Sequence, residues 1–142
     1  MNIDKFKHQH TDILRSIATL RALAHAGVEA NATTIAQGIV AMSGTIKLHL
    51  AVEDQVLYPA LQRGDNPDLA RRGRQYQSEM ASIASAYDAF ARRWNTAVSV
   101  RRNAEGFRSE ANVALRRVFE RMQREDHDFY PRIEEDETAD CH

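Results

Sequence analysis

Apolar residues recur along this chain with the period of an α-helix. They return every three or four residues, a spacing that places them on one face of a helix. Turn-forming residues interrupt the pattern at residues 27–32 and 63–68, and more weakly at residues 99–106. The uninterrupted segments predict four helices, over residues 3–26, 32–62, 68–97 and 104–135.

Helices of this length joined by short turns favour an all-α fold, an up-down-up-down antiparallel four-helix bundle. Asp65 or Asn66 before Pro67 is typical of the start of a helix. The length of 142 residues suits one domain with a core of its own. We expect this domain to span residues 1–136 and the acidic tail, residues 137–142, to fray.

The predicted inward face of every helix combines apolar residues with at least one polar residue. On the second helix this face runs through His49 and Glu53 and ends with Val56 and Ala60. The polar residues on the four inward faces are His10, His49, Glu53, Glu79, Arg121 and Glu125.

These polar residues fall in one layer of the predicted bundle. Counted from the turns at about 1.5 Å per residue, the two histidines and the three carboxylates lie at one depth. Unpaired charges in a core cost several kcal/mol each, so the layer needs compensation. A network of hydrogen bonds and ion pairs could supply it. A metal could also supply it, because imidazole and carboxylate together suit iron, zinc or manganese.

Two ten-residue segments of the chain repeat each other. Residues 52–61 align without a gap on residues 124–133, and each segment contains Glu-Asp, three further residues and then Tyr-Pro. His49 lies four residues before Glu53, so the imidazole and the carboxylate share one helix face. The equivalent position of the second segment holds Arg121. One half of a carboxylate-rich site is therefore intact, and the other half has lost a ligand.

Charge and cysteine content exclude several classes of protein. A formal net charge of -1 leaves no surplus of basic residues to neutralise phosphates, which argues against a nucleic-acid-binding protein. Cys141 is the only cysteine, so the chain has no disulfide framework. No apolar run approaches the ~20 residues of a membrane span, and the N-terminus lacks the apolar core of a signal peptide. We expect a cytoplasmic protein with no membrane partner.

With these motifs the chain resembles the hemerythrin-like (HHE cation-binding) domain family over nearly its whole length. Proteins of that family hold a non-haem di-iron centre with two bridging carboxylates inside a four-helix bundle. The resemblance rests on His10, on His49 and Glu53-Asp54 followed by Tyr58-Pro59, and on Glu125-Asp126 followed by Tyr130-Pro131.

The resemblance implies a role for each position of the polar layer. His10 and His49 would bind one iron, and Glu53 and Glu125 would be the bridging carboxylates. The second iron of the family takes three histidines, two from a His-x-x-x-His pair on the third helix and one from the fourth helix. In this chain those three positions hold Gln75, Glu79 and Arg121.

This difference predicts one bound iron ion, another divalent metal, or none, rather than two irons. Glu79 would be a further ligand or an ion-pair partner of Arg121, unless Met80 takes the inward position instead. A fixed guanidinium repels a second metal and can neutralise the carboxylates. Arg121, with Gln75 beside it, would then replace the second metal or support the ligands of the first.

The remaining histidines and the two tyrosines of the repeats have interpretations that need no metal. His8, His25 and His127 have no partner pattern, and we expect them on the surface. Tyr58 and Tyr130 are most simply residues that pack at a helix end before proline, although a phenol near a metal could tune it.

Two classes of function follow from this sequence. The first is a non-haem iron protein of oxygen, nitric oxide or iron sensing, storage or stress response, with dioxygen or nitric oxide as its ligand. The second is a metal-free scaffold for signalling or protein interaction, alone or as a homo-oligomer. A histidine phosphotransfer domain is also a four-helix bundle, but it needs an exposed histidine, and His49 lies on the buried face. We assign no catalytic residue and favour a binding protein over an enzyme.

Overall fold

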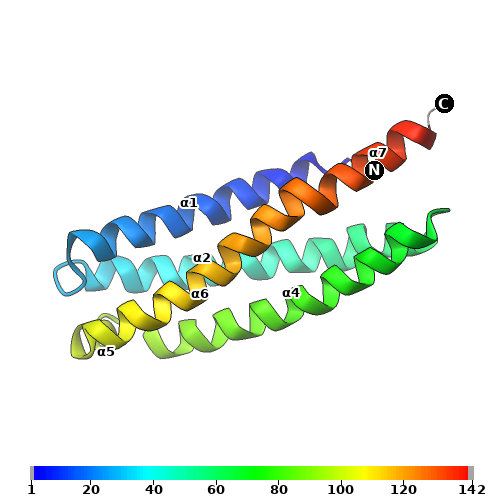
Figure 1. The fold of residues 1–142 in the computed structure, drawn as a ribbon. Helices are drawn as coiled ribbons and strands as arrows, with labels where there is room; N and C mark the ends of the chain where they lie inside the picture. The colour runs from blue at the N-terminus through cyan, green and yellow to red at the C-terminus, as the bar shows by residue number, and fades with distance from the viewer. Residues whose placement is uncertain (1, 141–142) are drawn as a thin grey trace.

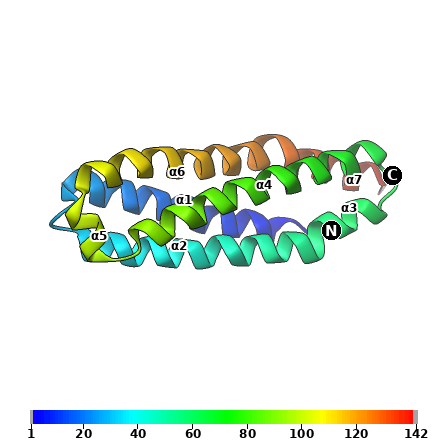
Figure 2. The same ribbon diagram turned by 90° about the horizontal axis from the view of Figure 1, so that it is seen from below.

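The chain forms long helical rods that lie side by side (Figure 1, Figure 2). The computed structural model describes residues 2–140. The first and third rods are the single helices α1 (Asp4–Gly27) and α4 (Pro67–Trp94). The second rod consists of α2 (Ala32–Val52), the π-helical segment η1 (Glu53–Leu57) and α3 (Tyr58–Arg63). The fourth consists of α6 (Ala104–Arg124), the π-helical segment η2 (Glu125–Phe129) and α7 (Tyr130–Asp140).

The predicted all-α fold is confirmed, and the packing is consistent with the up-down-up-down order. Helix α1 packs against α2 and α6, and α4 packs against the same two helices. The start of α1 and the end of α7 lie at the same end of the bundle (Figure 1). Helix α7 extends through Asp140, and the last two residues of the predicted tail, 141 and 142, lie outside the described residues.

Polar and glycine residues end the rods where the sequence indicates. Gly27 has a φ of 148°, a conformation that side chains rarely adopt, and it ends α1. The Asn66 side chain accepts a hydrogen bond from the backbone N–H of Leu69, as a helix cap does. The third predicted helix ends earlier than expected, at Trp94, because the side chain of Thr96 caps a short separate helix, α5 (Ala97–Arg102).

The repeated Tyr-Pro motif widens two rods at equivalent places. The backbone N–H of Tyr58 donates to the carbonyl of Glu53, and that of Tyr130 donates to the carbonyl of Glu125. Both bonds span five residues rather than four, so each rod contains one π-helical turn. In each copy a proline follows the tyrosine, and its ring would clash with the carbonyl four residues earlier in a regular helix. The wider turn avoids that clash.

The π-helical turn η1 also changes which residues face the core. Its extra residue turns Val56, which the helical period predicts to face inward, to the surface with 49% of its area exposed. Leu57 and Leu61 are buried in its place. The prediction was wrong at Val56 because it continued the ordinary helical period through Glu53.

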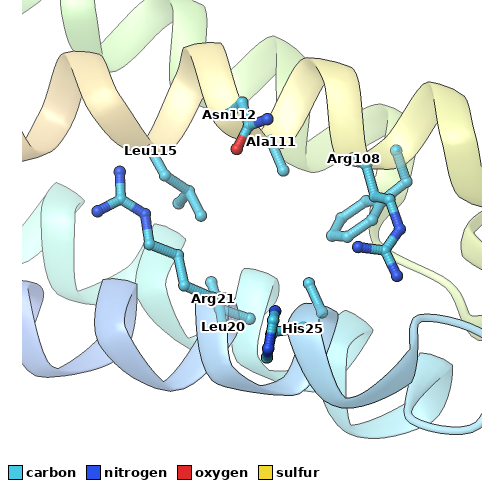
Figure 3. Close-up of a pocket in the computed structure, with 9 residues that line it drawn as sticks. Leu20, Arg21, His25, Arg108, Ala111, Asn112 and Leu115 are labelled. Carbon is cyan, nitrogen blue, oxygen red and sulfur yellow. The ribbon is translucent and has the colours of Figure 1, made fainter.

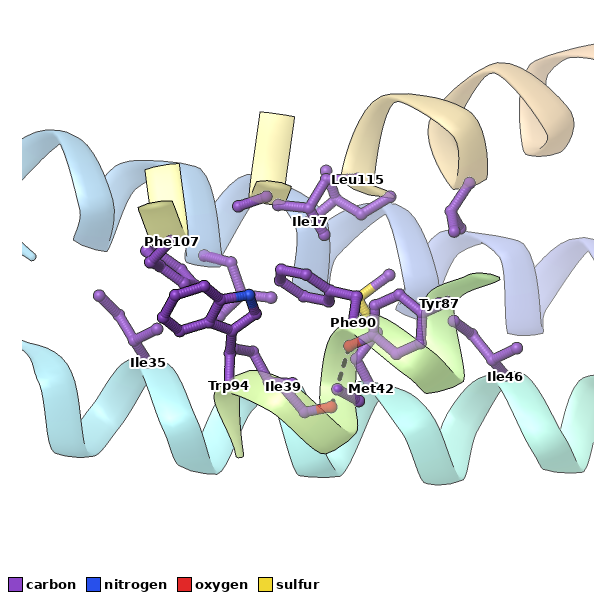
Figure 4. Close-up of a cluster of buried hydrophobic side chains, with 14 of the residues drawn as sticks. Ile17, Ile35, Ile39, Met42, Ile46, Tyr87, Phe90, Trp94, Phe107 and Leu115 are labelled. Carbon is purple, nitrogen blue, oxygen red and sulfur yellow. Dashed lines mark hydrogen bonds between the residues drawn. The ribbon is translucent and has the colours of Figure 1, made fainter. Parts of the chain in front are cut away.

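The apolar core has two parts, one on each side of the polar layer. The larger part lies toward the end that holds the α1–α2 turn and α5, and Figure 4 shows its centre around Tyr87, Phe90 and Trp94. There the Tyr87 hydroxyl donates a hydrogen bond of 2.9 Å to the carbonyl of Ile39. The smaller part lies near the chain ends and includes Phe6, Leu57, Tyr58, Phe129 and Tyr130.

One continuous helical stretch, Ala32–Arg63, is long and apolar enough to cross a membrane by length and composition alone. This corrects the expectation that no segment approaches that length. The support is weak, because a helix in the core of a bundle passes the same test. The inward face of this stretch buries Ile35, Ile39 and Met42, whereas Val40, Leu48 and Val56 are exposed.

The register change at η1 can be tested by a pair of truncations. We expect Leu57→Ala to lower the free energy of unfolding by about 2–5 kcal/mol, because it empties a fully buried site. Val56→Ala is the matched control and should change it by less than about 0.5 kcal/mol, as surface substitutions do. Urea unfolding measures both values. A larger loss for Val56→Ala would contradict the π-helical turn.

Candidate metal centre

Four ligand-type side chains meet in the polar layer, each with at most 1% of its area exposed: His10, His49, Glu53 and Glu125. His10 comes from α1, His49 from α2, and the two glutamates from the first residues of η1 and η2. The His10 Nε2 lies 3.0 Å from the His49 Nε2, and the His49 Nε2 lies 3.0 Å from Glu53 Oε1. The Glu125 Oε1 lies 3.5 Å from the His10 Nε2.

Several oxygens of this cluster lack a hydrogen-bond partner. Both carboxylate oxygens of Glu125 and one of Glu53 are buried without one among the described residues. The imidazole nitrogens approach these oxygens to 3.0–3.9 Å without forming a well-aligned hydrogen bond, so the carboxylates keep lone pairs that a cation can take up. His10, His49 and Glu125 each offer a ligand atom, and these atoms all lie within 4.8 Å of one another. The donor set of imidazole and carboxylate fits one divalent transition-metal ion.

A second contact fixes the orientation of each imidazole. The His10 Nδ1 lies 2.8 Å from a carboxylate oxygen of Asp126, and the His49 Nδ1 lies 2.7 Å from the side-chain oxygen of Gln9. Each oxygen accepts the Nδ1 proton, which leaves the Nε2 atoms free to face the centre. Neither Gln9 nor Asp126 was predicted to have a role. The only signal was that each one neighbours a candidate ligand.

Tyr130 also lines the centre, rather than packing only at a helix end. Its hydroxyl oxygen lies 3.1 Å from the His10 Nε2 and 3.4 Å from Glu53 Oε2, and its ring stacks on the His10 ring. Burial and the charges of the two glutamates raise the pKa of Tyr130, so it remains a neutral phenol in this state. The hydroxyl of Tyr58, the equivalent residue of the first repeat, is buried and has no hydrogen-bond partner in the part of the chain that the structure describes. In the sequence, the repeated Tyr-Pro motif was the feature that singled out both tyrosines.

Arg121, at the position where the resemblance predicts a histidine ligand, is buried beside Glu125. Its Nε lies 3.6 Å from Glu125 Oε1, and one terminal nitrogen donates a hydrogen bond of 2.5 Å to the carbonyl of Tyr76. The other terminal nitrogen lies 3.4 Å from Glu79 Oε2. The guanidinium carbon lies 4.4 Å from the centre of the Tyr76 ring, a cation–π contact. The arginine is therefore held by α4 while it faces the carboxylate on η2.

Glu79 and Gln75 lie at the edge of the bundle. The Glu79 side chain is 36% exposed and pairs with Arg121 and Arg124, whereas Met80 is fully buried. Gln75 is exposed, and its side chain donates to a carboxylate oxygen of Glu79. Of the two roles considered for Glu79, its contacts are those of an ion-pair partner of Arg121. A ligand role for Glu79 stays a prediction.

The charges in the layer compensate one another. Burial would raise the pKa of Glu125, but the close approach of His10 and His49 and the charge of Arg121 lower it. Burial and the charge of Glu125 raise the pKa of Glu53. Burial would lower the pKa of His49, yet the Glu125 and Glu53 carboxylates raise it to about 9. An incoming metal ion would therefore displace a proton from this cluster.

The other histidines with described positions behave as surface residues. His8, His25 and His127 are exposed, as expected, and the His127 Nε2 contacts the side-chain oxygen of Gln123 at 2.7 Å. Among residues 2–140, the histidines that enter the polar layer are His10 and His49.

Comparison with known families agrees with this geometry. The sequence profile of the hemerythrin HHE cation binding domain matches residues 1–133. The chain belongs to the hemerythrin family. No curated protein and no solved structure matches it. Membership of this family and the buried His-His-Glu cluster together support a metal-binding hemerythrin-like protein.

The two sides of the polar layer differ in the groups that they offer to a metal ion. The side with His10 and His49 offers imidazole and unpaired carboxylate oxygens, so it fits one ion. On the side of α4 and α6, Glu125 faces the buried Arg121, and among residues 2–140 no histidine from these two helices enters the layer. A second cation does not fit there, because the guanidinium would repel it.

The contact that orients His10 can be tested through metal affinity. We expect Asp126→Asn to weaken ferrous-ion binding about 10–100-fold, because it removes the carboxylate that fixes the His10 ring. The control is Asp54→Asn at the equivalent position of the first repeat. Asp54 is exposed and accepts a hydrogen bond from the Gln77 side chain. Its substitution should therefore leave the affinity for ferrous ion unchanged. Competition with a coloured chelator measures both affinities. Equal weakening by the two substitutions would show that the effect is one of overall charge.

Proposed function

We propose that this hemerythrin domain binds a single non-haem iron ion through His10, His49, Glu53 and Glu125. The observation that supports this most directly is the set of buried, unpartnered oxygens on Glu53 and Glu125 beside the two Nε2 atoms. An iron ion would satisfy these oxygens and would use the imidazoles that Gln9 and Asp126 already orient.

Arg121 takes the place of the second iron in this proposal. It supplies one fixed positive charge 3.6 Å from Glu125 Oε1, where the family would hold a metal. A guanidinium neither binds a ligand nor changes its oxidation state. Reversible dioxygen binding of the hemerythrin kind needs a redox change of two irons, so it would be lost. A role in sensing or storage of iron, or in the response to oxygen or nitric oxide, agrees better with one ion than dioxygen transport does.

The residues around the ion would control what reaches it. A ferrous ion supplies an electron and a coordination position for dioxygen or nitric oxide. The Tyr130 hydroxyl, beside His10 and Glu53, can donate a hydrogen bond to a small ligand there. Phe6, Leu57 and Phe129 cover the layer toward the chain ends and exclude water from it. We assign no catalytic residue, and a cytoplasmic location remains our expectation.

A second candidate function is a metal-free scaffold for signalling or protein interaction. The observation that favours it is that the layer can compensate its own charges. Arg121 lies beside Glu125, and the His10 and His49 nitrogens lie within 3.0 Å of each other, the distance of a hydrogen bond. In this alternative the bundle keeps its shape without an ion, and its outer faces recognise a partner or a second copy of the chain.

Metal content per chain separates these functions. We expect protein reconstituted anaerobically with ferrous iron to contain about one ion per chain by mass spectrometry, because one half of the centre is complete. Two ions per chain would contradict the role given to Arg121. A content near zero would favour the metal-free scaffold.

A single substitution tests whether Arg121 limits the metal content. Arg121→His removes the fixed cation and places an imidazole four residues before Glu125, as His49 stands before Glu53. We expect the iron content to rise above that of the unaltered chain in the same measurement. Arg124→His is the matched control, since Arg124 also pairs with Glu79 but is exposed. An unchanged content in Arg121→His would count against the replacement of a metal by arginine.

A further inference from the structure

The outward face of α2 has an unusual composition for the surface of a bundle. This helix runs along the lower edge of the view in Figure 2, and its outward face lies opposite the side that carries His49. Exposed residues return there every three or four positions over about five turns. We call the following residues the outer α2 face: Thr33, Gln37, Val40, Ala41, Gly44, Leu48 and Ala51. None of these residues is charged.

Charge is absent from almost the whole of α2. Lys47 is the only lysine, arginine, aspartate or glutamate of this helix. It lies at the edge of the outer α2 face, and its ammonium nitrogen is 3.6 Å from a carboxylate oxygen of Asp88 on α4. Elsewhere the bundle surface is charged, as at the boundary between α1 and α6, where Arg21, His25 and Arg108 are exposed (Figure 3).

The outer α2 face is also more apolar than an external position requires. Helix α2 belongs to the stretch whose hydropathy would suit a membrane span, yet 33% of the most apolar window of that stretch is buried. Val40 has 53% and Leu48 has 59% of its area exposed. Large apolar side chains on a continuous surface without charge indicate a face that another molecule covers.

The apolar part of this face is centred on Gly44. Val40 and Leu48 lie four residues before and four residues after it. Gly44 has no side chain, and no other side chain lies within 4 Å of the place where its Cβ would stand. A two-fold axis through Gly44 therefore sets two α2 helices antiparallel and in close approach, with Leu48 of one copy at the height of Val40 in the other.

A groove beside the face fits this arrangement. It has a volume of about 400 Å³ and lies between α1 and α2, where its α2 wall includes Gly38 and Ala41. Leu48 lies on the same side of the outer α2 face as Ala41, because the two residues are seven apart and hence two helical turns from each other. In the antiparallel pair, Leu48 of each copy packs over Ala41 of the other, next to the groove.

We propose that a second copy of this chain covers the outer α2 face, in an antiparallel α2–α2 dimer with its two-fold axis near Gly44. The absence of charge favours a second copy. In a two-fold interface each surface meets itself, so a charged face would meet like charges, whereas this face does not. The face lies outside the polar layer, so the dimer does not depend on the proposed metal.

A membrane surface is a poorer occupant of this face. Helices that lie on membranes combine an apolar face with several basic residues and with aromatic side chains. The outer α2 face has no aromatic residue, and its one basic neighbour is Lys47. The helix is also tied to the bundle, because His49 on its inner side belongs to the polar layer.

The mass of the full chain in solution tests the proposal. We expect sedimentation equilibrium at about 100 µM to give twice the chain mass of 16.1 kDa. Leu48→Glu should weaken the dimer at least about tenfold, because it places a carboxylate in the interface. Val113→Glu is the matched control, since Val113 is a 62% exposed residue of α6, and it should leave the dimer unchanged.

Three results would overturn the proposal. The first is a monomer at this concentration, and the second is equal weakening by Leu48→Glu and Val113→Glu. The third is binding of the unaltered chain to phosphatidylcholine vesicles that Leu48→Glu abolishes, which would assign the face to a membrane. Circular dichroism checks that each variant is folded.

Disulfide cross-linking then tests the antiparallel register. Cys141→Ser first removes the native thiol. In that background Gly44→Cys should form a disulfide-linked dimer on mild oxidation, because the axis brings the two copies of this residue together. Leu48→Cys should not, because its two copies lie eight residues apart in height, about 12 Å. A cross-link with Leu48→Cys and none with Gly44→Cys would overturn the proposed arrangement.

Discussion

The buried carboxylate of Glu125 is the charge to which the rest of the bundle interior is adapted. It is fully buried, and a carboxylate without compensation in a core costs several kcal/mol. The groups that compensate it come from three helices: His10 at 3.5 Å from α1, His49 at 3.9 Å from α2, and Arg121 at 3.6 Å from α6, the helix that leads into η2. Because these contacts converge on one residue, the relative heights of the helices are tied to the polar layer, which divides the apolar core into two parts.

The two π-helical turns explain how the layer is built from a repeated motif. Each begins at the glutamate that faces the centre, and each is followed by a proline that a regular helix would not accept. The extra residue rotates the remainder of each rod, so that Leu57 and the two tyrosines of the repeats turn inward. Tyr130 reaches the centre for this reason. The Tyr-Pro pairs therefore affect the geometry of the site, even though the prolines contact none of the ligands directly in the described contacts.

The two halves of the polar layer differ by one exchange between equivalent positions of the repeat. His49 and Arg121 each lie four residues before a buried glutamate, and each contacts that glutamate. An imidazole can give a lone pair to a metal, whereas a guanidinium cannot and remains charged. The first half therefore offers nitrogen and oxygen atoms of the kind that bind metals, while the second half offers charge compensation.

The helical segments, most of the inward faces and the polar layer could be predicted from the sequence, since these depend on a local period and on spacing along one helix. Motifs within single helices also identified His10, His49, Glu53 and Glu125. Features that depend on the π-helical turns and on packing between helices became visible only in the folded chain. There Leu57 turns inward in place of Val56, Tyr130 reaches His10, and Asp126 orients the His10 ring. Such contacts join residues far apart in the chain, and a helical period cannot specify how far one rod is rotated against another.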